Sequence, residues 1–341
     1  MSTDLAPWGY RPAIAELVSP ATTHGRVTRV DRGECDVMTE AGPVRAASDS
    51  VRSQDELAPV TGDWVELAVG PAGEPLIERV VPRLTALSRR DPGERDAEQV
   101  LAANIDIAAI VHGLDRPLPP GRLERMLVLA EDSGAEVVVV LTKVDTVDPD
   151  DDTVDVVTAV VDEVPILLTS TADGSGFDRL RDLIGSGRTL ALIGASGSGK
   201  STIVNTLVGD EVLDVGEVRE RDAKGRHTTT ARELVLLPGD AGLVLDTPGI
   251  RAIGLWDAEE ALHRVFADLD DLATECRFND CRHDREPGCA LVEGVESGVV
   301  DRHRFDRYRA LISELENQRR REEERARRPR GRGRRRGPRR R

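Results

Sequence analysis

The sequence is poor in aromatic side chains and lacks any long apolar run. Phe, Trp and Tyr together make up 3% of the 341 residues, so a core must be built mainly from Val, Leu, Ile and Ala. No stretch approaches the ~20 consecutive apolar residues that a membrane-spanning helix requires. The N-terminal MSTDLAPWGY has no basic segment leading into an apolar stretch, which is what an export signal would show. We therefore expect a cytoplasmic protein that does not interact with a membrane.

Cysteine is also scarce, with four in the chain. Cys276, Cys281 and Cys289 fall within fourteen residues and have His283 between them, whereas Cys35 stands alone. In a cytoplasmic protein such a group favours a metal over disulfides. Three thiolates and one imidazole fill the four positions around tetrahedral zinc, which leaves none open for catalysis. We predict one structural zinc per chain and an ordinary structural role for Cys35.

Acidic residues outnumber basic ones, but not along the whole chain. The net charge is −15, yet residues 319–341 hold fourteen Arg against three Glu, a local charge of +11 that leaves −26 on the rest. An Arg-, Gly- and Pro-rich end of this kind predicts a disordered tail over 319–341. Such a tail suits nucleic-acid backbones. A tail that only adds solubility fits the composition equally well.

Residues 1–88 are predicted to form an N-terminal extension and a small β-barrel. From about residue 20, turn residues separate five short alternating segments: HGRVTRVDRG, CDVMTE, VRAAS, GDWVELAV and PLIERVVP. Five such strands fit an OB-type barrel, a common oligonucleotide-binding fold. Arg26, Arg29 and Arg32 are candidates for a basic strip on this barrel. A purely structural β-domain would show the same pattern.

Residues 89–254 show the pattern of an α/β domain. The segment 89–103 is polar and predicts a connector. After it, apolar runs alternate with amphipathic stretches, which is typical of a mostly parallel sheet covered by helices on both faces. The expected strands are 105–111, 135–141, 164–170, 189–194, 233–238 and 242–246, and the expected helices lie near 121–133, 150–163, 177–184 and 199–208.

Residues 255–318 are predicted to form an α-helical domain that holds the zinc. The long apolar runs stop after about residue 251, and the Cys/His group lies in this part of the chain. Phe305, Tyr308, Ile312 and Leu315 recur at helical spacing. We expect this amphipathic helix to pack on its own domain.

The motif with the clearest chemistry is GASGSGKS, residues 194–201. It fits G-x-x-x-x-G-K-[ST] and lies between an apolar strand and a helix, as a phosphate-binding loop must. Its glycines let backbone N–H groups approach phosphate oxygens, and the helix start adds its positive end. Lys200 is predicted to reach the β- and γ-phosphates, and the Ser201 hydroxyl to hold Mg²⁺. The predicted nucleotide contacts are Gly194, Ala195, Ser196, Gly197, Ser198, Gly199, Lys200, Ser201 and Thr202.

Two further segments suit the metal ion and the terminal phosphate of a nucleoside triphosphate. LVLDTPG ends a strand at Asp246, which can hold Mg²⁺ through water, and places Gly249 where its N–H can bind the γ-phosphate. GRHTTT, residues 225–230, offers hydroxyl groups for the metal from a polar segment. The spacing does not decide between Thr229 and Thr230 as the metal ligand.

TKVD, which begins at Thr142, resembles the loop with which GTPases recognise guanine. The Asp145 carboxylate can accept hydrogen bonds from the guanine N1–H and exocyclic amine, which adenine does not offer. Lys143 is expected to lie along the base, and Val144 joins the two. The usual first residue of the motif is Asn. Thr142 offers fewer hydrogen bonds, although its hydroxyl can still connect neighbouring loops.

TSTADGSG, residues 169–176, resembles a second loop of the same kind of site. In that loop the backbone caps the guanine oxygen. The similarity places Ser170 and Thr171 at the base, with Thr171 where Ala is common.

The order of these motifs is unusual. Around a GTPase site the elements normally run phosphate loop, GRHTTT, DTPG, TKVD, TST, whereas this chain gives TKVD, TST, GASGSGKS, GRHTTT, DTPG. Because contacts rather than chain order build a site, joining the old ends and opening another loop preserves the arrangement. We therefore predict a circularly permuted P-loop GTPase domain in which TKVD and GASGSGKS meet around one guanosine nucleotide.

AANID (102–106), TKVD, GASGSGKST, GRHTTT, DTPGIR and CRFNDCRHDREPGCA (276–290) together resemble the RsgA (YjeQ) family of ribosome biogenesis GTPases. The likeness covers about residues 20–315. It implies an OB barrel, a permuted GTPase domain and a C-terminal zinc domain. It also implies binding to the small ribosomal subunit and its rRNA, GTP hydrolysis stimulated by that subunit, and a role in its late maturation. Thr142, Thr171 and the Arg-rich tail depart from the family pattern.

The group that would position the attacking water is missing from its usual place. Many GTPases carry Gln just after the DxxG motif, whereas this chain has Ile250, which cannot orient water by hydrogen bonding. His227, in GRHTTT, is the best internal candidate for a catalytic residue because an imidazole can accept a hydrogen bond near neutral pH. A His227 that contacts rRNA or packs locally is a nearly equal alternative.

Functions of different classes fit these motifs. The first is a GTPase that binds the small ribosomal subunit and acts in its maturation, binding GTP and GDP with Mg²⁺. The second is an RNA-binding module with a GTP/GDP-sensing site and negligible turnover, which Ile250 and Thr142 favour. A P-loop ATPase or metallochaperone is a third, against which Asp145 argues. We expect the protein to act as a monomer.

Overall fold

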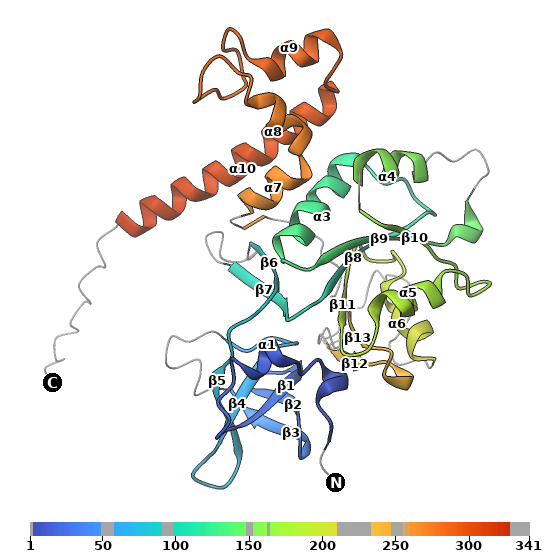
Figure 1. Cartoon of the computed structure of the whole chain (residues 1–341), viewed down its shortest axis with the longest axis vertical. Coiled ribbons are helices and arrows are strands. Elements are labelled where there is room, and N and C mark those ends of the chain that lie inside the picture. Colours follow the sequence, from blue (N-terminus) through green and yellow to red (C-terminus); the bar gives the residue numbers. More distant parts are fainter. Residues whose placement is uncertain are drawn as a thin grey trace, which may run out of the picture.

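The computed structural model describes residues 3–48, 58–90, 98–147, 153–161, 164–209, 233–246, 255–256 and 258–327. Figure 1 shows three bodies that follow one another along the chain: a β-barrel, an open sheet covered by helices, and a group of helices. Among the helices of these segments, none is both long enough and apolar enough to cross a membrane.

The N-terminal body is a closed five-stranded barrel, as the alternating segments predict. Its strands are β1 (Thr23–Val30), β2 (Glu34–Thr39), β3 (Gly42–Ala47), β4 (Trp64–Val69) and β5 (Pro75–Val80). They pair in the order β1-β2-β3-β5-β4, and β4 closes onto β1. Small and β-branched side chains fill the interior, which suits a sequence with few aromatics. This core consists of Val27, Cys35, Val37, Ala46, Val65 and Ile77. Cys35 is therefore an ordinary barrel residue.

A short N-terminal segment packs on the outside of the barrel. It contains the 3-10 turn η1 (Ala6–Trp8) and the short helix α1 (Pro12–Ala15). Ile14 from this segment is buried together with Trp64 of the barrel. The segment brings Trp8 and Arg11 to the side of the barrel that meets the sheet domain.

The prediction of a polar connector over residues 89–103 is wrong for residues 89–90 and 98–103, while residues 91–97 lie outside the described part of the chain. The chain instead forms a two-stranded antiparallel hairpin from β6 (Ala86–Arg90) and β7 (Glu98–Ala103). Its polar ends carry the charge that is typical of a connector, but Leu87 and Leu101 are buried against the rest of the domain. Tertiary burial of these few apolar residues therefore overrides a composition that is polar on average.

The second body is a six-stranded sheet with the strands that the apolar runs predict. They are β8 (Ile107–Gly113), β9 (Glu136–Thr142), β10 (Ile166–Leu168), β11 (Thr189–Ile193), β12 (Leu234–Leu236) and β13 (Leu243–Asp246). The order is β10-β9-β8-β11-β13-β12, and all neighbours are parallel except the edge strand β12. The carboxyl ends of β8, β9, β11 and β13 therefore share one edge, where ligands of open α/β sheets bind.

Helices cover both faces of this sheet. They are α3 (Pro120–Asp132), α4 (Thr153–Val161), α5 (Phe177–Ile184) and α6 (Lys200–Val208). Side chains alternate along β8, so that Ile110 packs with α3 and α4, whereas Ala109 and Val111 pack with α5 and α6. This explains why the strands are apolar throughout, since neither face is open to solvent.

The C-terminal body is helical and contains the Cys/His group. Its helices are α7 (Glu259–Val265), α8 (Ala267–Ala273), α9 (Ala290–Ser297) and α10 (Arg302–Arg327). Phe305, Tyr308 and Leu315 are buried on one side of α10. Residues 319–327, which the composition predicts to be a disordered tail, continue this helix. The rest of the predicted tail lies outside the described residues.

Arg26 does not belong to an exposed basic strip, which corrects the prediction from sequence. It is 1% exposed and lies between the barrel and the sheet domain. Its guanidinium donates to the carbonyls of Trp8 at 2.6 Å and Asn104 at 2.8 Å, and to the Thr189 hydroxyl at 2.9 Å. Burial lowers its pKa to about 10, so that it remains protonated at neutral pH. The side chain therefore fastens the barrel to the start of strand β11.

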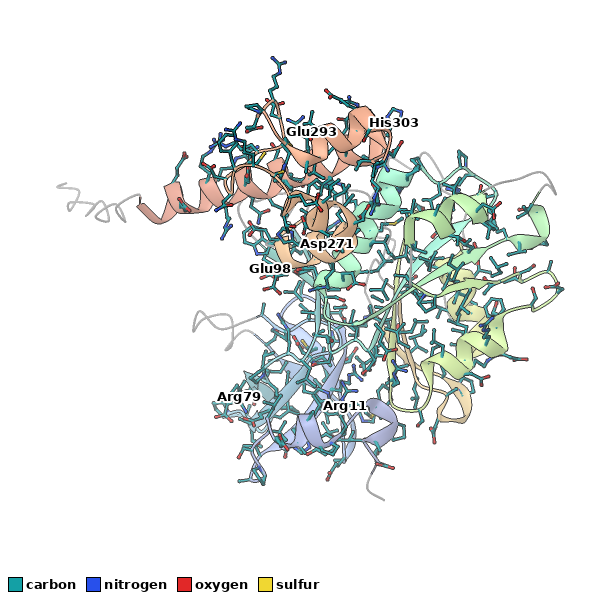
Figure 2. The ribbon with its side chains drawn as sticks, turned by 45° about the horizontal axis from the view of Figure 1, so that its top comes forward. Arg11, Arg79, Glu98, Asp271, Glu293 and His303 are labelled. Atoms are coloured by element: carbon teal, nitrogen blue, oxygen red, sulfur yellow. The ribbon has the colours of Figure 1, made fainter. Side chains whose placement is uncertain are left out.

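The AANID segment forms the other half of this junction. Asn104 adopts a left-handed conformation with φ 51°, and its side-chain amide donates to the carbonyl of Gly62 in the barrel at 3.1 Å. Asp106 accepts from the Thr189 N–H at 2.8 Å and from Arg11 at 2.6 Å. Figure 2 labels Arg11 in the N-terminal segment beside the barrel. The segment thus joins the N-terminal body to the strand that leads into the phosphate loop.

A buried carboxylate fastens the helical body to the sheet domain. The side chain of Glu124 in α3 is 0% exposed and accepts from Arg304 at 3.2 Å and from Arg307 at 2.5 Å. Both arginines belong to α10. Arg304 also pairs with Asp268 at 2.7 Å and lies over the Phe266 ring at 4.7 Å. Helix α10 therefore contacts the sheet domain as well as its own domain.

Candidate functional site

GASGSGKS forms a loop between β11 and α6, as its spacing predicts. Gly197 and Gly199 have φ values of 74° and 98°, which favour glycine. The Lys200 amine folds over the loop and donates to the carbonyls of Gly194 at 3.0 Å and Ala195 at 2.8 Å. Burial lowers the pKa of Lys200, and the nearby charge of Asp246 partly opposes this. The amine is thus held inside the loop, where a phosphate group can take the place of the carbonyls.

Ser201 and Asp246, the two predicted magnesium ligands, contact each other at the start of α6. The Ser201 hydroxyl donates to Asp246 Oδ2 at 3.1 Å. The other carboxylate oxygen, Oδ1, is buried and accepts no hydrogen bond within the described residues. Burial raises the pKa of Asp246, an effect that Lys200 and Ser201 oppose. A buried carboxylate oxygen without a donor, beside a hydroxyl, suits a hard cation that takes oxygen ligands.

The guanine-type loop lies directly against the phosphate loop. The Thr142 hydroxyl donates to the carbonyl of Ser198 at 2.8 Å, and the Lys143 amine donates to the carbonyl of Gly197 at 3.2 Å. A Cβ at Gly199 would lie 3.0 Å from the Thr142 hydroxyl oxygen, so that only glycine leaves room there. Two segments more than fifty positions apart in sequence therefore form one site. Thr142 makes the connection between loops that its hydroxyl was expected to allow.

Asp145 and Ser170 lie together beside this junction. The Ser170 hydroxyl donates to Asp145 Oδ1, which fixes the direction of the carboxylate. Lys143 is left-handed, with φ 62°, and Val144 begins a single 3-10 turn that carries Asp145. A pocket of about 70 Å³ opens between the two loops and α6. It is lined by Thr142, Lys143, Thr169, Thr171, Phe177, Gly199, Thr202 and Ile203.

Several predicted residues lie outside the described part of the chain. These are His227, Thr229 and Thr230 of GRHTTT, and Gly249 and Ile250 after Asp246. Their roles remain predictions from sequence.

The four predicted zinc ligands converge. One atom from each of Cys276, Cys281, His283 and Cys289 lies within 4.8 Å of the others. His283 Nδ1 is 3.6 Å from Cys276 Sγ and 3.5 Å from Cys289 Sγ, and the two sulfur atoms are 3.9 Å apart. Separations of this size fit ligands that surround tetrahedral zinc at about 2.0–2.3 Å. The donor set therefore fits a structural zinc ion.

Backbone geometry delivers these ligands to one point. His283 is left-handed, with φ 55°, and Gly288 has φ 77°. The Arg277 N–H donates to the Gly288 carbonyl at 2.9 Å, which closes the loop and brings Cys289 back. Burial raises the pKa of the Cys289 thiol to about 11, so its ionisation depends on a bound cation.

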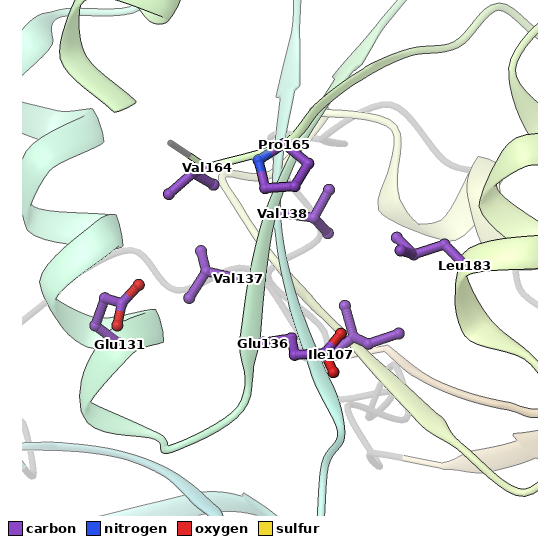
Figure 3. Close-up of a pocket in the computed structure, with 8 residues that line it drawn as sticks. All are labelled: Ile107, Glu131, Glu136, Val137, Val138, Val164, Pro165 and Leu183. Atoms are coloured by element: carbon purple, nitrogen blue, oxygen red, sulfur yellow. The ribbon is translucent and has the colours of Figure 1, made fainter. Parts of the chain in front are cut away.

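A larger pocket, of about 350 Å³, lies at the amino ends of the strands, on the side of the sheet domain opposite the nucleotide loops (Figure 3). It includes Ile107 and Glu136, the first residues of β8 and β9, whereas the nucleotide loops follow the last residues of these strands. Its lining is mostly aliphatic, and Glu136 is paired with Arg188 at 2.7 Å. The pocket has no convergent polar groups of the kind that the carboxyl edge provides, so its size does not make it the functional site.

The motifs in the sequence do not include the loop after β8. Asp115 pairs with the Lys143 amine at 2.7 Å, and Arg116 donates to the carbonyls of Ser196 and Gly197. His112, the residue before Gly113 at the end of β8, holds the same loop through the Arg116 carbonyl at 2.9 Å. The parallel strand order could have pointed to these residues before the structure was known. A loop that leaves β8 must emerge beside the loops that leave its parallel neighbours β9 and β11.

Comparison with known proteins points in one direction. Residues 80–256 match the sequence model of the family described as RsgA GTPase. The chain is 46% identical over 329 residues to "Small ribosomal subunit biogenesis GTPase RsgA" of Streptomyces avermitilis, which covers 93% of this chain and 87% of the relative. A protein of the same name from Methanosarcina acetivorans is 38% identical over 295 residues, with 86% and 80% covered.

Solved structures with the same arrangement also match. A protein described as YjeQ from Thermotoga maritima superposes with a TM-score of 0.61 at 26% identity, covering 86% of this chain and 98% of that one. YloQ, described as a circularly permuted GTPase, gives a TM-score of 0.59 at 24% identity, covering 87% and 96%. The second likeness shows the fold, including the permuted order that the motifs predict.

Proposed function

Because this chain belongs to the RsgA GTPase family, we propose that it hydrolyses GTP as a factor in the biogenesis of the small ribosomal subunit. The single observation that best supports this is the contact between the two nucleotide loops. Thr142 and Lys143 donate to the carbonyls of Ser198 and Gly197, so that a base-reading loop and a phosphate loop form one site. Relatives covering most of the chain are named small ribosomal subunit biogenesis GTPases.

We assign the selection of guanine over adenine to Asp145. Ser170 donates to one carboxylate oxygen and so fixes the orientation of the group. The carboxylate then accepts from the N1–H and exocyclic amine of guanine, while adenine would place an acceptor against it. Thr171 lines the pocket between the two loops and presents its backbone to the base. The remaining predicted contacts of this loop are Val144 and the stem of Lys143.

Phosphate binding falls to the loop from Gly194 to Thr202. On nucleotide binding, the Lys200 amine exchanges the carbonyls of Gly194 and Ala195 for phosphate oxygens. Ser201 and Asp246 would hold Mg²⁺, which supplies positive charge at the β- and γ-phosphates when bound. Backbone N–H groups at the start of α6 add their positive partial charge.

Hydrolysis requires a group that positions water, and we assign this role to His227. Ile250 stands where a Gln is common, so the protein's own rate is expected to be slow. We propose that the small ribosomal subunit stimulates turnover, in its late maturation, by fixing the GRHTTT segment with Thr229 or Thr230 on the metal and the Gly249 N–H on the γ-phosphate. Replacement of His227 by Ala should then abolish the stimulation.

The outer domains are proposed to hold the rRNA. We assign residues 1–88 to the barrel domain, 89–254 to the GTPase domain and 255–318 to the zinc domain, with a basic end beyond it. The Cys276, Cys281, His283 and Cys289 group would hold one structural zinc and so fix the loop that carries it. We further propose that the protein acts as a monomer in the cytoplasm.

The direct test is phosphate release from GTP with and without purified small ribosomal subunits. Slow release alone and a rise of at least about 10-fold with small subunits is expected, because only the subunit completes the water-positioning group. Large subunits at equal concentration serve as the control. GTP binding without any stimulated release would instead support an RNA-binding module with a nucleotide-sensing site, for which Ile250 is the favouring residue.

A second test addresses base selection through Asp145→Asn. The amide keeps one acceptor for N1–H but turns a donor toward the guanine amine, so GTP affinity should fall by at least about 100-fold. Xanthosine triphosphate, which carries a carbonyl in place of that amine, should bind better to the variant than to the parent. Asp178→Asn is the matched control, since the Asp178 side chain is 99% exposed in the first turn of α5 and pairs with Arg181 rather than with either loop of the site. Equal loss in both variants would contradict the assignment.

A further inference from the structure

The loop between β8 and α3 packs against the outer side of the two loops that form the proposed nucleotide site. The Leu114 N–H donates to the Thr142 carbonyl at 3.0 Å, and Asp115 pairs with the Lys143 amine at 2.7 Å. His112, buried at the end of β8, donates its Nε2–H to the Arg116 carbonyl at 2.9 Å. Burial lowers the pKa of His112, which favours the neutral ring with one N–H. This loop is therefore held against both the base-reading strand and the phosphate loop.

Arg116 spans two neighbouring peptide groups of the phosphate loop. Its Nη1 donates to the Ser196 carbonyl at 3.3 Å and its Nη2 to the Gly197 carbonyl at 3.1 Å. Gly197 has φ 74°, and a Cβ there would lie 3.1 Å from Nη2. Lys143 donates to the same Gly197 carbonyl at 3.2 Å. Two cationic side chains thus cover the outer surface of a loop whose inner surface faces the nucleotide.

The planarity of the peptide group connects the two surfaces. In a trans peptide the C=O and the following N–H point in opposite directions. Cations that hold the carbonyls of Ser196 and Gly197 outward therefore turn the N–H groups of Gly197 and Ser198 inward. The Ser198 N–H indeed points to the Ala195 carbonyl at 3.3 Å, the same oxygen that accepts from Lys200. A donor on the carbonyl side also polarises the peptide and strengthens its N–H as a donor.

We propose that Arg116 is a positioning residue for nucleotide binding. It does not touch the nucleotide. It acts through the peptide groups after Ser196 and Gly197, by fixing their planes and strengthening the N–H groups that face the phosphates. A guanidinium presents two N–H groups in a fixed planar fork, a geometry that suits the two adjacent carbonyls on the outside of the loop. This inference rests on the proposed nucleotide site, but it concerns a residue that none of the sequence motifs contains.

The experiment compares Arg116→Ala, Arg116→Lys and Arg122→Ala in the full-length protein. Arg122, in the first turn of α3, is a matched control because its removal changes the net charge equally on the same segment. Affinities for fluorescent GDP and GTP are measured by titration with Mg²⁺. Turnover with small subunits then separates KM from kcat. Thermal unfolding without nucleotide verifies that each variant is folded, which is expected since Arg116 is 40% exposed.

Arg116→Ala is expected to weaken GDP and GTP binding about 10-fold and to raise KM with kcat within about twofold, because the lost contact serves ground state and transition state alike. In Arg116→Lys the loss of affinity should be smaller, about 3-fold. In Arg122→Ala the affinity should stay within about twofold of the parent value. Parent-like affinity in folded Arg116→Ala, an equal loss in Arg122→Ala, or a fall in kcat at unchanged KM would each overturn the inference. Failure of the parent itself to bind GDP would instead refute the proposed function.

Discussion

The barrel and the C-terminal helical body, which is the proposed zinc domain, are both fastened to the sheet domain by arginine, but by different chemistry. At the barrel, all four hydrogen-bond acceptors of the buried Arg26 are neutral, including the carbonyl of Asn104 and the hydroxyl of Thr189. At the zinc domain, the acceptor is the buried carboxylate of Glu124, and its partners Arg304 and Arg307 are 20% and 26% exposed. The arginine at the barrel junction is enclosed, whereas the arginines at the other junction form ion pairs at the edge of solvent.

The difference indicates that the two outer domains are held with different rigidity. A charge with neutral partners in a closed interior cannot exchange them for water without leaving several groups unpaired. Ion pairs near solvent are weakened by salt and by competing charges such as phosphates. We therefore expect the barrel to move with β11 and the zinc domain to be the more adjustable of the two. Four experiments test this difference between the junctions.

Removal of zinc should have the largest effect, and it should affect the proposed zinc domain but not the barrel. Structural zinc contributes on the order of 10 kcal/mol to folding in small zinc domains. Chelation should therefore unfold the loop from Cys276 to Cys289 and leave the barrel intact, because the barrel has an apolar core of its own. Hydrogen exchange over residues 276–300 and 23–80 measures this. Cys289→Ser should lose the zinc, whereas Cys35→Ala should retain one zinc per chain. Loss of protection in both regions would contradict independent folding.

Arg26→Met should cost about 3–4 kcal/mol, since it leaves buried carbonyls of Trp8 and Asn104 without donors. The free energy of unfolding from denaturant titration is the measurement, and hydrogen exchange should show the barrel loosened from β11. Arg32→Met is the control, because Arg32 is exposed on the same barrel and should change stability by at most about 0.5 kcal/mol. Equal effects of the two variants would mean that burial of Arg26 is not decisive.

Glu124→Gln should cost about 2–3 kcal/mol, because it leaves two arginines facing a neutral group in a buried position. Limited proteolysis of the zinc domain should be faster than in the parent at low salt, and the difference should shrink in high salt, which weakens the ion pair of the parent. Glu314→Gln breaks the neighbouring, half-exposed pair with Arg125 and should cost less than about 1 kcal/mol. A zinc domain that stays protected in Glu124→Gln would show that apolar packing alone holds it.

Asp106→Asn is expected to have the smallest effect, about 1 kcal/mol. The amide oxygen can still accept from the Thr189 N–H, and Arg11 is 41% exposed, so that water replaces much of what the pair loses. Thermal unfolding measures the change. Arg11→Gln provides the reciprocal test, and the double variant should cost no more than the larger single one. A fully additive double variant would show that Arg11 and Asp106 act independently.

The sequence predicts those parts of the molecule whose signal is local. The apolar runs mark all six strands of the open sheet, and the spacing of Gly194, Lys200 and Ser201 is enough to mark the phosphate loop. Four potential ligands within fourteen residues likewise mark the Cys/His cluster. In each case neighbouring residues make the feature, so a short stretch carries the whole pattern.

The junctions and the outer loop are not predictable in this way because their partners are remote in sequence. Arg26 meets Thr189, and Glu124 meets Arg307, across separations of more than 150 positions. A buried arginine and an exposed one look alike in a strand, which is why the alternating pattern alone predicts an exposed Arg26. The role of Arg116 likewise follows only from the carbonyls that it contacts in the folded protein. Contacts of this kind depend on the assembled fold rather than on composition.

The order of strands in the open sheet also bears on how the protein is made. Synthesis delivers β8, β9 and β10 first, and these pair outward in one direction from β8. The other edge of β8 stays unpaired until β11 leaves the ribosome about 75 residues later, which takes several seconds at about 5–20 residues per second. During that interval the nascent chain presents an apolar, open strand at the centre of its future sheet. Such an edge is a substrate for chaperones and a starting point for mispairing.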